Sequence, residues 1–532
     1  MKKLVLRIIL TAVCALFAIA LIVGDTIAYS HHGEITSHLS PATEIVDETK
    51  VEEANAAGEE VVQQIAAEGI TLLKNNGTLP LQMPEDNTGY PVNVFGIGQV
   101  SGYYNNRRLG FFYSGAGSGS NGPKAGKEVT FRAGLEQAGF VLNPDLYDAF
   151  YQNKANFDAD WYNDSNKLLQ NAKTYSDTAI VVISRATGEN QGETEWTTDT
   201  TQETGMACPW YDTDEDGRNP LQIALREEAM LDYVCDGFRN VIVLINAGNS
   251  MELGYMDRDE VDALLYVSHP GQSGTKQIGN VLAGKVNPSG HTTDTFAYDT
   301  KADPTWANVI LNRTNGKQIN YAEDIYFGYK WYETAFAEKV NFTVNYGEGD
   351  VNLDFSTEEG YDKIVQYPFG YGLSYTTFDW EIRGMEWVVD GVTSAADDGD
   401  TLADRDTTIR VTVRVTNTGD VPGKDALQLY YSAPYIDGGI EKAAVNLVAF
   451  AKTGMLYPEG YVPPEEDTSD DENTATSSET GGTDEETPEE PSYPVYEDVV
   501  LEFDVYDMAS YDCYDDNGNG FTGWGLGPGE YR

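Results

Sequence analysis

Three glutamates lie close together in the sequence, just after the end of an apolar run. In "ISRATGENQGETEW" (183–196), Glu189, Glu193 and Glu195 are interleaved with two glycines. A carboxyl group positioned beside a reacting bond can act as a general acid. Acid catalysis on a sugar or an ester usually needs a second carboxylate or another nucleophile facing the first group. The stretch therefore predicts one half of a catalytic pair, and the alternative is an acidic loop with no catalytic role.

The chain is long and strongly acidic. Its 532 residues include 86 Asp and Glu against 34 Lys and Arg, for a formal net charge of -52. The length is enough for two or three domains, and the charge argues against a nucleic-acid partner, because phosphate backbones need a positive surface. Residues 464–491 are rich in Asp and Glu and contain no apolar residue larger than alanine. We expect them to form a disordered acidic insertion.

The N-terminal residues have the composition of an export signal. Lys2, Lys3 and Arg7 precede an uncharged run over residues 8–24. The run is slightly shorter than the ~20 residues that span a bilayer, so a retained anchor and a cleaved signal peptide both stay open for residues 1–30. Either one predicts that the rest of the chain is extracytoplasmic, membrane-anchored or secreted, with residues 31–50 as a polar tether.

Short apolar runs alternate with helical patterns in the first two thirds of the chain. A helical pattern over 51–67 ends at Gly69, and another covers 221–238. The runs expected as strands are apolar on both faces, as in a parallel sheet covered by helices. They span residues 92–98, 178–185, 240–248 and 261–268. This rhythm predicts a mostly parallel α/β sandwich domain over residues 51–385.

The pattern changes after Trp380. Residues 409–415 alternate Ile or Val with polar residues, and residues 426–432 and 499–505 behave similarly. Such alternation is typical of half-buried antiparallel strands. We therefore expect an all-β sandwich over residues 400–532, with the acidic insertion in one of its loops.

Five stretches in order resemble parts of one enzyme family. They are "EGITLLKNNGTLPL" (68–81), "VDALLYVSHPGQSGTKQIGNVLAGKVNPSG" (261–290), "YAEDIYFGYKWYET" (321–334), "YPFGYGLSYTTFDW" (367–380) and "NTGDVPGKDALQLYYSAP" (417–434). Together they resemble the second and third domains of glycoside hydrolase family 3, which includes many β-glucosidases and β-xylosidases. The resemblance implies an α/β sandwich domain followed by a fibronectin type III-like domain.

The resemblance also implies a role for the opening stretch. In β-glucosidases of this family, a Ser-Gly-Glu-Gly segment after a strand supplies the acid/base glutamate, and "ATGENQ" (186–191) stands at the matching place. Glu189 is therefore the implied acid/base residue. Asn190 stands where the family commonly has glycine, so Glu193 stays open as the alternative. The family uses no metal or organic cofactor, and none is implied here.

The family's nucleophile is an aspartate of a (β/α)8 barrel, and these 532 residues contain no set of eight β-α repeats. The sequence stops at "GPGEYR", where we expect the last strand of the β domain to begin. Some members are permuted, so we expect the barrel domain beyond Arg532. The predicted function is part of a retaining β-glycosidase that hydrolyses β-linked oligosaccharides. The alternative is a non-catalytic, membrane-displayed carbohydrate-binding or scaffolding protein.

Aromatic residues are numerous, with 34 Tyr, 19 Phe and 8 Trp. Trp196, Trp331 and Tyr332 have rings that could stack on a sugar. Most such residues are expected in the core or at a domain interface instead.

Overall fold

The computed structural model describes residues 13, 48–104, 107–111, 113–114, 128–153, 156–185, 221–306, 321, 323–345, 350–396, 407–436, 438–463, 493–516, 518, 520, 522–527 and 529–532. The chain divides into two compact units, residues 1–60 and 61–532. Helix α3 (Glu48–Gly69) ends at Gly69, as the sequence predicts. The acidic insertion and the N-terminal segment 1–30, apart from Val13, lie outside the described residues. No helix in the described part of the chain is long and apolar enough to cross a bilayer.

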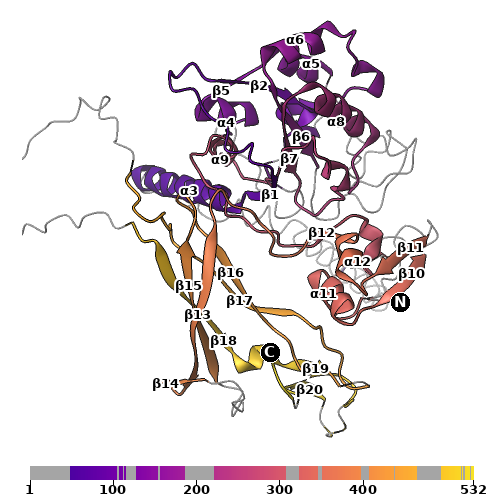
Figure 1. Cartoon of the computed structure of the whole chain (residues 1–532), viewed down its shortest axis with the longest axis vertical. Helices are drawn as coiled ribbons and strands as arrows, with labels where there is room; N and C mark the ends of the chain where they lie inside the picture. Colours follow the sequence, from indigo (N-terminus) through magenta and orange to yellow (C-terminus); the bar gives the residue numbers. More distant parts are fainter. Residues whose placement is uncertain are drawn as a thin grey trace, which may run out of the picture. The chain divides into compact units, whose positions relative to one another are not determined.

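A six-stranded sheet forms the centre of the α/β region (Figure 1). Its strands, in spatial order, are β1 (Thr71–Asn75), β8 (Ala263–Tyr266), β7 (Asn240–Asn246), β6 (Thr178–Ser184), β2 (Tyr90–Phe95) and β5 (Phe140–Leu142). All neighbours are parallel except β1, which pairs antiparallel with β8 at one edge. The four strands predicted as buried on both faces are β2, β6, β7 and β8, so the mostly parallel sheet is confirmed.

Helices cover both faces of this sheet because its strands present apolar side chains in both directions. In β6, Val181 belongs to the core cluster on one face, and Ile180 and Val182 belong to the cluster on the other. The first cluster includes residues of α5 (Pro144–Asn153), α6 (Lys167–Tyr175) and α8 (Leu225–Gly237), whereas the second includes residues of α4 (Phe131–Ala138) and α9 (Thr275–Leu282). Helix α8 is the one predicted over 221–238.

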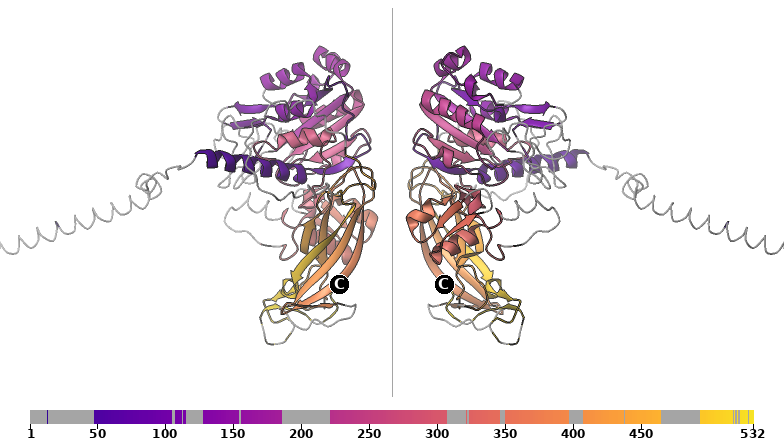
Figure 2. Two further views of the ribbon diagram at one scale, coloured as in Figure 1. Left: turned by 90° about the vertical axis from the view of Figure 1, so that its left-hand side faces the viewer. Right: turned by 90° about the vertical axis from the view of Figure 1, so that its right-hand side faces the viewer.

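Antiparallel strands form the C-terminal part of the chain. One sheet has the order β14 (Val392–Ala395), β13 (Phe378–Val389), β15 (Thr408–Asn417) and β18 (Tyr496–Asp504), and a second pairs β16 (Ala426–Tyr431) with β17 (Asn446–Lys452). The long strands run side by side in both views of Figure 2, coloured orange to yellow. The three strands predicted over 409–415, 426–432 and 499–505 are thus present as β15, β16 and β18.

A third apolar cluster lies between these regions in the sequence, around helix α11 (Tyr329–Ala337). Its remaining elements are β9 (Phe296–Ala297), β10 (Asn341–Asn345), β11 (Asp350–Asp354), α12 (Glu358–Asp362) and β12 (Val365–Tyr367). Two further hairpins pair β3 (Ser101–Tyr104) with β4 (Arg107–Gly110) and β19 (Ser510–Asp512) with β20 (Gly523–Gly525). Tyr332 is buried in the cluster around α11. This agrees with the expectation that most aromatic residues lie in the core or at a domain interface.

Candidate active site

The strand order contains a switch point between the neighbouring strands β2 and β6, because the chain goes from β2 to β5 on one side and from β6 to β7 on the other side. From β2 the chain passes to β5 on one side, and it then returns to β6 on the other side of β2. In open α/β sheets, ligands bind at the carboxyl ends of the strands at such a switch point. Strand β2 ends at Phe95 and β6 ends at Ser184. We call the edge formed by the C-terminal ends of β2, β6, β7 and β8 the carboxyl edge.

The turn after β2 packs directly onto β6. Gly96 has φ 95°, and a Cβ atom there would lie 2.5 Å from the carbonyl oxygen of Val182. A Cβ atom on Gly98 would lie 2.5 Å from Oγ of Ser184. Only glycine fits these two positions, since a methyl group would push the turn away from β6. The two glycines therefore bring the turn against the end of β6 at the switch point.

Arg185 follows β6 at the carboxyl edge, and its side chain is buried. Its guanidinium donates to both carboxylate oxygens of Glu227, at 2.8 and 2.6 Å, and to the carbonyl oxygen of Gln222 at 2.9 Å. Glu227 also accepts a hydrogen bond from the backbone N–H of Ala224 at 3.0 Å, ahead of α8. The backbone N–H of Arg185 donates to the carbonyl oxygen of Asn246. Arg185 thus joins the end of β6 to the residues that lead into α8.

The predicted acid/base residue follows this anchor in the chain. Glu189 and its alternative Glu193 belong to residues 186–220, which lie outside the described residues. Trp196 lies in the same segment. The structure therefore describes the residues on both sides of the predicted catalytic stretch, and the role of Glu189 stays a prediction.

Polar groups from β7 and β8 meet at the same edge. Asn246, the last residue of β7, donates through its side chain to the carbonyl oxygen of Ser268 at 2.6 Å. The next residue, His269, has a pKa lowered by burial, an effect partly opposed by a hydrogen bond with the backbone of Arg185. His269 is thus held neutral at a pH where an exposed histidine is partly charged.

Asp294 is a second carboxyl group near this edge. It accepts hydrogen bonds from Ser250 Oγ at 2.9 Å and from the backbone N–H of Thr295 at 2.9 Å. Burial raises the pKa of Asp294, although both hydrogen bonds oppose that effect. Ser250 follows β7 in the chain, so Asp294 is tied to the loop that leaves that strand.

The sequence analysis missed the Arg185–Glu227 pair, His269 and Asp294. A signal for the pair was present, because an arginine at the end of a fully buried strand needs an acidic partner. Glu227 is 42 residues away and is one of two adjacent glutamates, so the sequence alone did not identify it. In the described part of the chain, no group of three or more His, Cys, Asp or Glu side chains could hold a metal ion.

The described residues form the base of a site and suggest its chemistry. The carboxyl edge holds a neutral histidine, a buried ion pair and a carboxyl group with a raised pKa. A carboxyl group placed above the neutralised Arg185 would not meet an unpaired cation, which would otherwise lower its pKa.

Known proteins resemble the chain over most of its length. Residues 70–329 match the glycosyl hydrolase family 3 C-terminal domain. A β-glucosidase of Ruminococcus albus is 30% identical over 413 residues, which cover 75% of this chain and 34% of that protein. β-Glucosidase A of Butyrivibrio fibrisolvens is 31% identical over 415 residues, covering 74% of this chain and 44% of that protein. The chain thus spans less than half the length of these two relatives.

Solved structures give the same result. A β-glucosidase from Paenibacillus barengoltzii superposes with a TM-score of 0.60 at 26% identity, over 89% of this chain and 40% of that one. β-Glucosidase 3B from Thermotoga neapolitana, solved in complex with glucose, superposes with a TM-score of 0.57 at 25% identity, over 86% of this chain and 50% of that one. Residues 70–329 of the chain are therefore a glycosyl hydrolase family 3 C-terminal domain.

Proposed function

We propose that this chain is the acid/base part of a retaining β-glycosidase that hydrolyses β-linked oligosaccharides. Glu189 is the proposed acid/base residue, with Glu193 as the alternative. The nucleophile would be an aspartate of a (β/α)8 barrel domain that packs against the carboxyl edge. Support comes from the curated relatives, which are named β-glucosidases and of which this chain spans a part.

The observation that carries this proposal is the position of Arg185 at the switch point. A chain advances at most ~3.6 Å per residue. Glu189 is four residues beyond Arg185 in the sequence, a separation that an extended chain spans in at most about 14 Å. Glu193 is twice as far along the chain, with a limit of about 29 Å. The tighter tether favours Glu189 as the carboxyl group held at the site.

The proposed mechanism has two steps. Glu189 first donates a proton to the leaving oxygen while the barrel aspartate attacks the anomeric carbon. The glycosidic bond breaks and a covalent glycosyl–enzyme ester forms. Glu189, now a carboxylate, then removes a proton from water, which attacks the anomeric carbon and releases the aspartate. The Arg185–Glu227 pair supports the first step, because a neutralised guanidinium does not favour early ionisation of the acid.

We also propose the setting in which this site works. The antiparallel region at residues 400–532 would be a fibronectin type III-like domain, and residues 1–30 would anchor the chain to a membrane or direct its export. Cell fractionation and N-terminal sequencing of the mature protein test the location. Recovery of the unprocessed protein in the cytoplasm would contradict export.

The proposal that cleavage needs both the acid/base glutamate and the barrel aspartate can be tested with the 532-residue chain itself. One carboxylic acid without its nucleophile cannot form the glycosyl–enzyme. The purified chain should therefore release nitrophenol from an aryl β-glucoside no faster than a Glu189→Gln variant does. Turnover that survives further purification and disappears in Glu189→Gln would contradict the proposed role of the barrel aspartate.

A further inference from the structure

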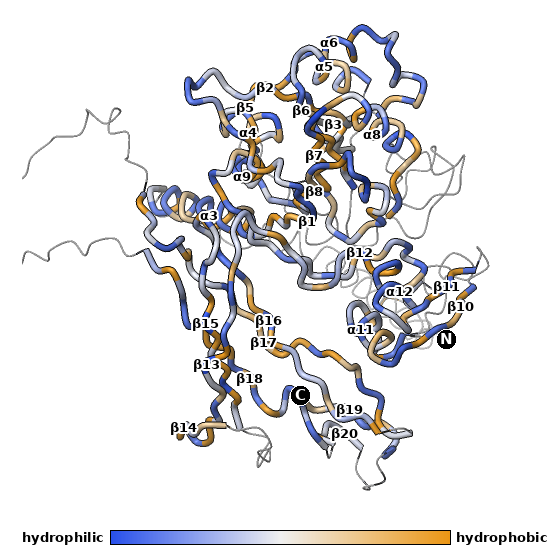
Figure 3. The backbone as a smooth tube through the Cα atoms, in the orientation of Figure 1, coloured by the Kyte–Doolittle hydropathy of each residue, from blue (hydrophilic) through white to orange (hydrophobic). Residues whose placement is uncertain are grey.

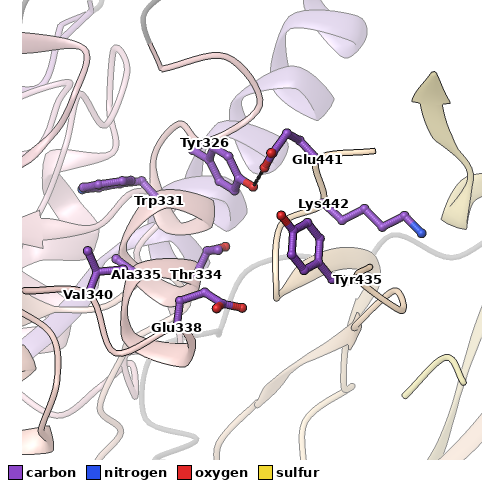
Figure 4. A pocket seen from close by; sticks show the side chains of 9 residues that line it. All are labelled: Tyr326, Trp331, Thr334, Ala335, Glu338, Val340, Tyr435, Glu441 and Lys442. Carbon is purple, nitrogen blue, oxygen red and sulfur yellow. Dashed lines mark hydrogen bonds between the residues drawn. The ribbon is translucent and has the colours of Figure 1, made fainter. Parts of the chain in front are cut away.

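A pocket of about 240 Å³ is lined by residues within the ranges 326–340 and 435–442, which are far in the sequence from the proposed acid/base stretch (Figure 4). One wall is a single face of α11 and its C-terminal end, because Trp331, Thr334 and Glu338 are spaced by three and four residues. The other wall is the loop between β16 and β17, with Tyr435 and Glu441. The pocket is thus built from two segments about 100 residues apart in the chain.

Hydrogen bonds between the two segments hold the walls together. Tyr326 donates to the carboxylate of Glu441 at 2.5 Å. The backbone N–H of Ala444 donates to Thr334 Oγ1 at 2.9 Å, and that of Leu447 donates to the hydroxyl of Tyr329 at 2.9 Å. These hydrogen bonds pre-organise the pocket, which reduces the cost of ordering it on binding.

Aromatic rings give the pocket an apolar surface with fixed geometry. The indole N–H of Trp331 donates to the carbonyl oxygen of Ala302 at 2.9 Å, and its ring packs edge-to-face on Phe342 and Phe355. Tyr435 lines the opposite wall and is 45% exposed. The exposed ring of Tyr435 can offer a flat face to a ligand at a low cost in side-chain entropy.

Charged groups at the pocket limit the class of ligand. The carboxylates of Glu338 and Glu441 disfavour an anion. The ammonium of Lys442 donates to the carbonyl oxygen of Pro434 at 2.7 Å and points away from the other lining side chains in Figure 4. The two carboxylates can accept hydrogen bonds from hydroxyls. A neutral ligand with many hydroxyls and an apolar face satisfies both the rings and the charges.

We propose that this pocket is an accessory binding site for one pyranose unit of a carbohydrate. A pyranose has C–H groups that stack on an aromatic face and a rim of hydroxyls that can donate to the carboxylates of Glu338 and Glu441. The volume of the pocket is below the roughly 300–1,000 Å³ of sites for drug-sized ligands and suits a single sugar ring. The choice of glucose as the probe rests on the proposed function.

The residue before α11 lies close to Asp294 of the candidate active site. Gly328 precedes α11, and a Cβ atom there would lie 3.9 Å from Asp294 Oδ1. Asp294 is in turn bonded to Ser250 after β7. The residue before α11 thus packs near Asp294, and neither Gly328 nor Asp294 lines the pocket.

Titration of the 532-residue chain with glucose and with cellobiose, by calorimetry and saturation-transfer NMR, tests the proposal. Tyr435→Ala should weaken binding about three- to tenfold, because it removes one stacking face. Glu338→Gln should weaken it less. Tyr506→Ala is the matched control, since Tyr506 is 44% exposed and does not line the pocket, and it should bind glucose as the unaltered chain does.

Two results would overturn the proposal. One is the absence of glucose binding at concentrations well above the millimolar range, and the other is binding that Tyr435→Ala and Glu338→Gln leave unchanged. Glu189→Gln separates this site from the proposed acid/base role, because that variant should keep the glucose affinity of the pocket. Loss of glucose binding in Glu189→Gln would likewise contradict an accessory site and place the sugar at the catalytic stretch.

Discussion

The parallel and antiparallel sheets bury their strands differently. Every residue of β6 is buried, whereas β15 alternates buried and half-buried residues. Hydropathy along the backbone follows this difference, with continuous apolar colour in β7 and alternation in β15 (Figure 3). A strand covered on both faces leaves no room for polar side chains except at its ends. In β6 and β7, polar side chains therefore stand only at the strand ends, at Thr178, Ser184, Asn240 and Asn246.

Two ion pairs of similar geometry show the consequence. Arg185 and Glu227, at the carboxyl edge, have side chains that are 6% and 4% exposed. Arg414 and Asp498 form an equivalent two-point pair across β15 and β18, with side chains 27% and 41% exposed. Water screens the second pair and is excluded from the first, so the same contacts should differ in their effect on stability.

The largest effect is expected from breaking the buried pair. Glu227→Gln leaves the guanidinium of Arg185 without a charged partner, which should lower the free energy of unfolding by about 3–5 kcal/mol. Denaturant unfolding followed by tryptophan fluorescence measures the loss. A double variant, Arg185→Met with Glu227→Met, should recover much of it, because no buried charge remains unpaired. If Glu227→Gln lowers the free energy of unfolding by less than about 1 kcal/mol, the buried pair contributes no more than a surface pair does, which would contradict this prediction.

The second comparison concerns apolar side chains of the two sheets. Leu244 in β7 is fully buried, and Leu244→Ala should cost about 2–5 kcal/mol through lost burial and a new cavity. Ile382 in β13 is 74% exposed, and Ile382→Ala should change stability by less than about 0.5 kcal/mol. Thermal and denaturant unfolding of both variants check the contrast. Equal losses would show that β13 is covered in solution.

A smaller effect is expected from pH. Burial lowers the pKa of His269 and of His291 below the ordinary value of 6.5. As the pH falls below about 6.5, each histidine binds a proton in the unfolded chain before it does so in the folded chain. The stability contributed by each buried neutral histidine is therefore complete above about pH 6.5 and is lost as the pH falls through the lowered pKa of the folded state. Stability should decline over this acidic range, and His269→Asn should make the decline shallower. An unchanged slope in that variant would contradict a buried neutral His269.

The smallest effect is expected at the exposed pair. Asp498→Asn should change the free energy of unfolding by no more than about 1 kcal/mol, because solvent screens the charges and the arginine retains its stacking on Tyr496. The same denaturant experiment used for Glu227→Gln measures it. A loss as large as that of Glu227→Gln would remove the distinction between the two sheets.

Much of this fold could be predicted because burial leaves a clear pattern in the sequence. The strands β6 and β7 are short apolar runs, and β15 alternates strictly, so each pattern indicates its environment. The edge strands β1 and β5 were not predicted, since β5 has only three residues and β1 pairs antiparallel with β8. Short edge strands are set by their tertiary partners rather than by periodicity.

The site was predicted less completely than the fold. The location of Glu189 after β6 came from a motif, but the Arg185–Glu227 pair depends on how α8 packs at the end of β6, which no local pattern records. Trp331 was predicted either to stack on a sugar or to lie in the core, and it packs on core rings while it also lines the pocket. Pockets built from distant segments depend on tertiary contacts such as that between Tyr326 and Glu441.

Glu189 is the proposed acid/base group, and azide rescue distinguishes it from Glu193. In a polypeptide that contains both these residues and the proposed barrel domain, Glu189→Ala should slow cleavage of cellobiose far more than that of a dinitrophenyl β-glucoside, because a good leaving group needs little protonation. Added azide should restore turnover of the dinitrophenyl substrate and yield a β-glycosyl azide. Glu193→Ala should show neither behaviour. Selective loss and azide rescue in Glu193→Ala, with full activity in Glu189→Ala, would contradict the assignment.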